Sequence, residues 1–104
     1  MSEYCLMLTT TNDLSITKKI TNVLLESNLA ACIQIDDVKS YFKWNKKIAF
    51  EKEYRLIIKA KSSNYVEIEA KILEIHNYEL PQIIKINIDC GFQKYLEWIN
   101  QNNK

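Results

Sequence analysis

His76 is the only histidine in the 104-residue chain, and therefore the only imidazole available for acid–base or metal chemistry near neutral pH. A Ser–His–Asp or Cys–His catalytic arrangement would have to use it, but no serine or cysteine stands in the sharp-turn context of a nucleophile. The zinc patterns H-x-x-H and H-E-x-x-H are absent as well. As a metal ligand, His76 would need Glu74, Glu79 or a second subunit. The sequence therefore predicts no enzyme, and a hydrogen-bonded histidine at a helix end is the commoner role.

Lys59 lies in a segment of alternating charge that also contains Glu51, Glu53 and Arg55. In an extended strand these side chains point to the same side, because every second residue does. Such a ladder of opposite charges could bind a small anion or a metal. It could equally form salt bridges between subunits, and the residues alone favour the salt bridges. Arg55 lies in mid-strand, so the phosphate-cradling loop of an acyl phosphatase is not indicated.

Composition excludes several function classes. The 14 basic and 13 acidic side chains give a net charge of +1, too little positive excess for a dedicated nucleic-acid or polybasic membrane binder. With a single glycine, Gly91, the chain has no glycine-rich phosphate loop. The first residues carry Glu3 and no basic cluster, unlike a signal peptide, and no run of about 18 apolar residues occurs. Together with three isolated cysteines, this predicts a cytoplasmic protein with reduced thiols, no membrane association and no nucleic-acid partner.

Hydrophobic periodicity predicts the elements that position these residues. Apolar runs predict strands at residues 4–10, 31–35, 48–61 and 83–89. Residues 38–44 extend the second strand after a short break at Asp36–Asp37, and residues 45–47 form the turn of a long hairpin. Helical spacing predicts helices at 13–28, at 62–76 with His76 in the last turn, and from Gly91 onward. The tail, residues 100–104, is expected to fray.

This order of elements is that of an α+β, ferredoxin-like βαββαβ sandwich, with an extended hairpin between the second and third strands and an added C-terminal helix. We expect residues 1–104 to form a single domain, with two helices on one face of the sheet. Alternation predicts that Ile84, Ile86 and Ile88 point inward. The residues predicted on the uncovered face are Cys5, Met7, Thr9, Cys32, Gln34, Ile57 and Lys59. Because this face is partly apolar and lacks stacking aromatics, it favours self-association and not RNA binding.

Five motifs occur in the order in which one known family has them. They are Leu29-Ala30-Ala31-Cys32; Ser40, Trp44 and Lys47; Glu51, Glu53, Ile57 and Lys59; His76-x-Tyr78-x-x-Pro81; and Gly91 with Tyr95-Leu96-x-Trp98. From about Met7 to Ile99 the chain resembles the CutA divalent-cation tolerance family. The resemblance implies a ferredoxin-like subunit in a stable cytoplasmic homotrimer, bridged by the hairpin. It also implies a role in tolerance of copper and other divalent cations, which would be its ligands, without a defined catalytic activity.

The resemblance implies where a site would lie. The family's metal contacts involve the motif histidine, which is His76, the residue before it, which is Ile75, and a first-strand position occupied by Thr9. Threonine and isoleucine are poor copper ligands, so His76 is the one matching metal ligand. The polar motif residues predicted to form a cleft between subunits are Glu53, Lys59, Tyr78, Tyr95 and Trp98. The hypothesis is that His76 and nearby carboxylates bind copper or another divalent cation there.

Two other functions stay open at this point. One is a trimer of the same fold that senses a small anion or a nucleotide through Lys59, although the chain has one arginine and no glycine-rich loop. The other is a structural or partner-anchoring trimer, in which the motif residues serve assembly alone. The chain also departs from the family pattern at the hairpin tip, where Lys46 replaces glycine, and after the motif histidine, where Asn77 replaces proline.

Overall fold

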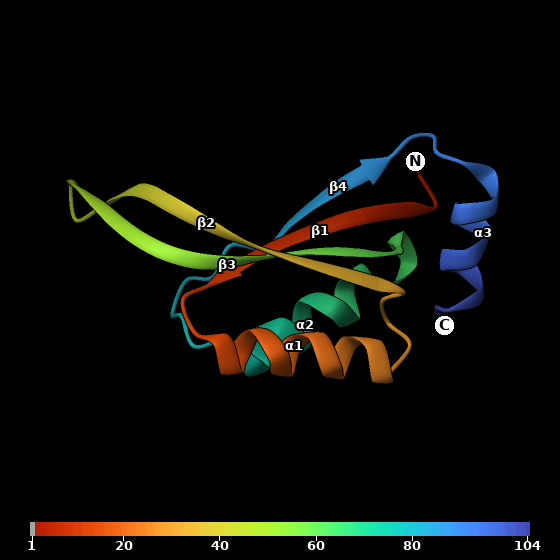
Figure 1. The fold of residues 1–104 in the computed structure, drawn as a ribbon, viewed down its shortest axis with the longest axis horizontal. Helices are drawn as coiled ribbons and strands as arrows, with labels where there is room; N and C mark the ends of the chain where they lie inside the picture. The colour runs from red at the N-terminus through yellow and green to blue at the C-terminus, as the bar shows by residue number, and fades with distance from the viewer. Residues whose placement is uncertain (1) are drawn as a thin grey trace.

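The computed structural model describes residues 2–104, which form one four-stranded antiparallel sheet and three α-helices. In chain order the elements are β1 (Tyr4–Thr11), α1 (Leu14–Glu26), β2 (Cys32–Trp44), β3 (Lys47–Lys61), the short 3₁₀ helix η1 (Ser62–Asn64), α2 (Tyr65–Ile75), β4 (Ile84–Ile88) and α3 (Gln93–Gln101). The strand order is β2-β3-β1-β4. Helices α1 and α2 lie on one side of the sheet, the β2–β3 hairpin projects beyond them, and α3 lies at the opposite end (Figure 1). The predicted ferredoxin-like α+β arrangement is confirmed.

Local sequence explains the boundaries of α1. The Asp13 carboxylate accepts hydrogen bonds from the backbone N–H groups of Ser15 and Ile16, at 2.8 and 3.1 Å, and so caps the first turn. At the other end Asn28 has a φ of 59°, the left-handed conformation in which helices commonly stop. The predicted helix over 13–28 is therefore correct to within its two caps.

The hairpin is longer and more regular than predicted. Asn45 and Lys46 both have positive φ, 51° and 63°, which fits a two-residue turn whose twist matches that of the strands. The break predicted at Asp36–Asp37 is wrong, because β2 runs unbroken from Cys32 to Trp44. Asp36 pairs with Arg55 across the ladder, and their side chains form a 2.8 Å salt bridge. This cross-strand ion pair favours the extended conformation at Asp36.

The core lies between the sheet and helices α1 and α2. From the sheet it takes Cys5, Met7, Leu56, Ile58 and Ala60, and from the helices Ile20, Leu24, Ile68 and Ile72. This corrects the predicted uncovered face: Cys5, Met7 and Thr9 point toward the helices, because they pair with Ala60, Ile58 and Leu56. The structure places Cys32, Gln34, Ile57 and Lys59 on the other face, as predicted.

The face without helices is largely apolar. Leu6 and Leu8 of β1 pair with Ile86 and Ile84 of β4, and Leu8 also pairs with Ile57 of β3, so all five share this face. Ile84 and Ile86 are each 45% exposed and Ile88 lies on the same face, so the prediction that these three isoleucines point into the core is wrong. Their neighbours Lys85 and Asn87 take the helix side at the sheet edge, since they pair with Met7 and Cys5.

The C-terminal tail is fixed in place, and the prediction that it frays is wrong. Asn103 Oδ1 accepts hydrogen bonds from the Lys61 backbone N–H and from Asn64 Nδ2, each at 3.2 Å. The backbone N–H of Lys104 donates to the Asn28 carbonyl at 2.9 Å. These contacts tie the end of α3 to the end of β3 and to the loop after α1.

Candidate functional site

The residues predicted to share one cleft lie in two clusters along β3. Glu53, Tyr78 and His76 form the first, here called the hairpin-base cluster because it lies where the hairpin leaves the sheet. Lys59, Tyr95 and Trp98 form the second, here called the Lys59 cluster. Glu53 and Lys59 are six positions apart on one strand, which corresponds to about 20 Å. A single chain therefore does not bring the predicted residues together.

Both ring nitrogens of His76 are engaged within the chain. His76 follows α2 directly as its C-cap, and not in its last turn as predicted. The Tyr78 backbone N–H donates to Nδ1 at 3.0 Å, so Nδ1 must be the unprotonated nitrogen. Nε2 then carries the proton and donates it to the Thr10 carbonyl at 2.9 Å. In this arrangement neither nitrogen has a lone pair to offer a metal.

Tyr78 connects this histidine to a buried carboxylate. Its hydroxyl donates to Glu53 Oε2 at 2.7 Å, and its ring lies 4.8 Å from that of His76. Burial raises the pKa of Tyr78, and the hydrogen bond and negative charge of Glu53 raise it further. Glu53 is only 8% exposed, yet no basic group among residues 2–104 lies within salt-bridge distance of it. The cluster thus holds a largely buried negative charge without a cation.

A chain of amide hydrogen bonds supports the cluster. Thr11 Oγ1 donates to Asn77 Oδ1 at 2.6 Å, and Asn77 Nδ2 donates to Asn12 Oδ1 at 2.9 Å. Asn12 Nδ2 in turn donates to Glu51 Oε1 at 2.9 Å. The end of β1, the α2–β4 loop and the base of the hairpin are thereby held together. Sequence reasoning missed these asparagines, and the one available signal was that Asn77 replaces the family's proline.

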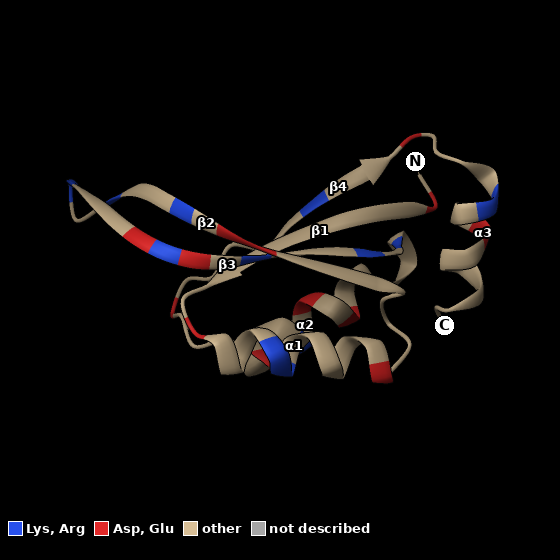
Figure 2. Ribbon diagram, viewed as in Figure 1, with Lys and Arg blue, Asp and Glu red and all other residues tan. Residues whose placement is uncertain are grey.

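A pocket of about 430 Å³ adjoins the hairpin-base cluster. The residues that line it are Asn12, Asp37, Val38, Lys39, Lys52, Glu53 and Tyr54. Acidic and basic residues alternate along this stretch of β3, whereas β1 carries no charged residue (Figure 2). The pocket therefore has an ionic wall on the hairpin, and Glu53 belongs to both the pocket and the cluster.

The Lys59 cluster is more open. Lys59 Nζ donates to the Tyr95 hydroxyl at 3.3 Å and lies 5.3 Å from the centre of the same ring. Tyr95 and Trp98 stack at 5.6 Å on α3, and both are exposed. Cys32 pairs with Lys59 across the β2–β3 ladder. This cluster offers a cation, a thiol and two aromatic faces to whatever contacts it.

The residues fit a divalent cation only in part. Within residues 2–104, no three histidine, cysteine, aspartate or glutamate side chains converge on one point. Thr9 Oγ1 is buried without a hydrogen-bond partner on the helix-covered side, and Ile75 packs against the core. Glu53 accepts its hydrogen bond at Oε2 alone, which leaves Oε1 free to contact a cation, and Glu53 lines the adjoining pocket. The carboxylate fits a metal ion better than the imidazole does.

Comparison with known proteins identifies the family. The family model described as CutA1 divalent ion tolerance protein matches residues 5–102. The chain belongs to the CutA1 family. This CutA1 chain is 36% identical over 84 residues to the divalent-cation tolerance protein CutA of Archaeoglobus fulgidus, covering 81% of this chain and 82% of that protein. It is 31% identical over 96 residues to the protein of the same description from Pyrococcus horikoshii, covering 92% and 94%.

Solved CutA1 structures share the fold over nearly the whole chain. CutA1 from Shewanella sp. SIB1, described as a stable protein, superposes with a TM-score of 0.94 at 37% identity and covers 98% of this chain and 96% of its own. The Archaeoglobus fulgidus structure superposes with a TM-score of 0.92 at 32% identity and covers 95% and 97%. The latter is described as periplasmic, and an Arabidopsis thaliana relative as chloroplastic, so CutA1 membership does not determine location. No helix of residues 2–104 is long and apolar enough to cross a membrane.

Proposed function

We propose that this CutA1 chain acts as a cytoplasmic homotrimer in the tolerance of divalent cations, and that it binds copper or another divalent cation without catalysing a reaction. Membership of the CutA1 family supports the role in cation tolerance. The observation that carries the assembly is the large apolar surface that one chain leaves uncovered.

The projecting hairpin is the strongest support for assembly. It exposes Tyr41, Trp44, Ile48 and Phe50, with Ile48 80% exposed. A two-stranded hairpin is at best marginally stable in water, because it has no third layer on which to bury such side chains. Tyr41, Ile48 and Phe50 share one face of the ladder and Trp44 lies on the other, so the hairpin exposes apolar side chains on both faces, which is rare in soluble monomers. Contact with neighbouring copies would cover the hairpin and the uncovered sheet face together.

Light scattering on the purified full chain, at micromolar concentration, tests the assembly. The expected mass is three times the 12.3 kDa of one chain. An Ile48→Lys variant should dissociate or weaken the trimer, because it places a charge in the proposed contact. A matched Lys18→Gln variant, on the exposed side of α1, should leave the mass unchanged. A monomer at this concentration would overturn the proposal.

The cation site would centre on Glu53. Its charge is buried and lacks a basic partner, and a divalent cation would supply the missing positive charge. One chain supplies too few ligands, so further donors would come from a second subunit. Carboxylate oxygens suit hard and borderline cations, whereas copper favours imidazole and sulfur and would require His76 to give up one of its two hydrogen bonds.

Calorimetric titration with Cu²⁺ and Mn²⁺ tests this site. Glu53→Gln should weaken cation binding by tenfold or more, while the exposed Glu97→Gln control should not change it. His76→Gln should leave the Mn²⁺ affinity unchanged, and a loss of Cu²⁺ affinity would identify the imidazole as a copper ligand. Equal affinities in the wild-type protein and Glu53→Gln would remove Glu53 from the site. A melting-temperature rise with nucleotides, and none with cations, would favour the sensing function instead.

A further inference from the structure

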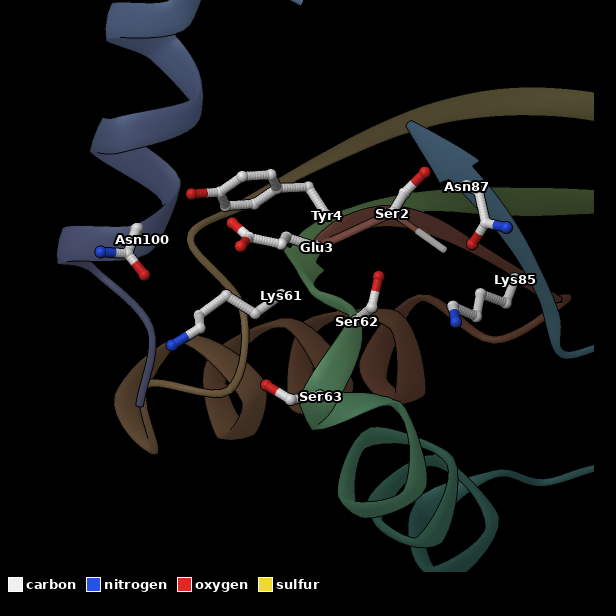
Figure 3. Close-up of a pocket in the computed structure, with 9 residues that line it drawn as sticks. All are labelled: Ser2, Glu3, Tyr4, Lys61, Ser62, Ser63, Lys85, Asn87 and Asn100. Carbon is white, nitrogen blue, oxygen red and sulfur yellow. The ribbon is translucent and has the colours of Figure 1, made fainter. Parts of the chain in front are cut away.

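A second pocket, of about 610 Å³, lies at the other end of the sheet from the hairpin. The residues that line it are Ser2, Glu3, Tyr4, Lys61, Ser62, Ser63, Lys85, Asn87 and Asn100 (Figure 3). They come from the start of β1, the end of β3, η1, β4 and α3. None of them belongs to the hairpin-base cluster or to the Lys59 cluster, so this pocket is separate from the site proposed above.

The pocket carries two lysines without ionic partners. Among residues 2–104, neither Lys61 nor Lys85 lies within 4.0 Å of a carboxylate oxygen, and Glu3 is the one acidic residue in the lining. Lys85 extends from β4 toward Ser62, whereas Lys61 and Glu3 turn toward α3 (Figure 3). At the Lys85 end of the pocket the positive charge therefore has no carboxylate partner, although Lys85 Nζ lies 6.0 Å from the centre of the Tyr65 ring.

Ser62 places an unused hydroxyl beside this charge. Its Oγ is shielded from solvent and has no oxygen or nitrogen hydrogen-bond partner among the described residues, and the Cys5 thiol is the polar group beside it, which is an unfavourable state for a buried hydroxyl. Burial raises the pKa of the neighbouring Cys5 thiol, and the Ser62 hydroxyl and the Lys85 charge offset part of that rise. A thiol is a weak partner for a hydroxyl, so the Ser62 hydroxyl retains its capacity to bind a stronger acceptor.

We propose that this pocket binds a small phosphorylated metabolite, with the phosphate held by Lys85 Nζ and by the Ser62 hydroxyl, whose side chain rotates out of its shielded position to reach the ligand. A phosphate oxygen would satisfy the unpartnered hydroxyl and neutralise the ammonium in one contact, and such charge-assisted hydrogen bonds are the strong ones. The volume leaves room for a sugar-sized group, for which Asn87, Asn100 and Tyr4 offer hydrogen bonds.

Calorimetry in a low-salt, phosphate-free buffer tests the proposal, with inorganic phosphate and glucose 6-phosphate as probes. Both should bind the wild-type protein, and the sugar phosphate should bind more tightly because its hydroxyls can reach the amide side chains. Lys85→Gln should weaken both by about tenfold. Ser62→Ala should weaken both several-fold without lowering the melting temperature of the ligand-free protein, because the lost hydroxyl has no partner.

The control is Lys18→Gln, which removes the same charge from the exposed side of α1. It should bind both probes as the wild-type protein does. Equal weakening of probe binding in Lys18→Gln and Lys85→Gln would show that binding depends only on the net charge of the protein, and would overturn the proposal. Absence of binding at millimolar probe would overturn it too, as would a Ser62→Ala protein that melts earlier but binds with unchanged affinity.

Discussion

The two clusters at opposite ends of β3 differ in how completely their polar atoms are partnered. In the hairpin-base cluster, hydrogen bonds of 2.7–3.0 Å join Glu53, Tyr78 and His76 to one another and to the backbone. In the Lys59 cluster, one 3.3 Å hydrogen bond and two ring contacts hold exposed side chains. The first arrangement fixes a loop inside one chain, and the second leaves its groups available to a neighbour. Polar motif residues can thus stabilise the fold of one subunit, as in the hairpin-base cluster, or remain exposed and able to contact another molecule, as in the Lys59 cluster.

Replacement of His76 by alanine should show the largest difference between the clusters. It removes both hydrogen bonds of the ring and leaves the Tyr78 N–H and the Thr10 carbonyl without partners. We expect a loss of about 3 kcal/mol in the free energy of unfolding. Denaturant unfolding at one fixed protein concentration measures it, and His76→Gln should recover part of the loss. A change below about 1 kcal/mol would show that the two hydrogen bonds of His76 contribute little to stability.

Tyr78→Phe should come next. The variant keeps the ring but leaves the buried Glu53 carboxylate without its donor, at a cost of about 2 kcal/mol. The same denaturant experiment measures this loss. The double variant Tyr78→Phe/Glu53→Gln should cost less than the sum of the two single changes, because the neutral amide no longer needs the hydroxyl. Strictly additive losses would contradict a direct bond between the two residues.

The pH dependence of stability should separate the clusters further. The folded state raises the pKa of Tyr78 above its ordinary value of 10.0, so above that pH only the unfolded chain readily loses the proton. The stabilisation is complete below pH 10 and is lost as pH rises from there toward the folded-state pKa. Unfolding free energies of the wild-type protein should therefore decline above pH 10 more steeply than those of Tyr78→Phe. The raised pKa of Tyr65, which donates to Glu69, affects both proteins equally. Parallel curves would contradict the prediction.

Lys59→Gln should have the smallest effect of the four. The side chain is partly exposed, and its long hydrogen bond and ring contact together contribute less than about 1 kcal/mol to stability. Lys59→Arg should be closer still to the wild-type protein. Thermal melts at low and high salt measure both variants. A loss as large as that of Tyr78→Phe would show that Lys59 is a structural residue and would erase the contrast between the clusters.

The sequence predicts the order of elements well because each has its own local signal. Asp13 caps α1, and the alternation of residues 54–60 places Leu56, Ile58 and Ala60 on the core side. The faces of β1 could not be predicted, because a central strand is apolar on both sides and alternation does not determine which side meets the helices. The isoleucines of β4 were misplaced for a related reason. They face away from the helices, toward a surface that a second subunit would cover.

The candidate site was predictable only as a set of residues. The motif spacing singled out His76, Tyr78 and Glu53, and the structure joins all three. The motif spacing did not indicate that both nitrogens of the His76 imidazole would form hydrogen bonds within the chain, because that depends on where the Thr10 carbonyl lies in the fold. Nor did it separate Lys59 from Glu53, since residues on one strand share a face however far apart they lie. In the proposed assembly, the position of a second chain would decide whether the two clusters meet.

The contacts of Asn103 and Lys104 have a consequence for the order of folding. Asn103 binds the Lys61 backbone, 42 positions away in the sequence, and Lys104 binds the loop after α1. Contacts between residues so far apart in the sequence form slowly, because a long loop must close before they contribute any stability. We therefore expect α3 and the residues after it to dock late, after the hairpin and the first helix have formed. Until they dock, the end of β3 and the loop after α1 stay open to incorrect contacts with other chains.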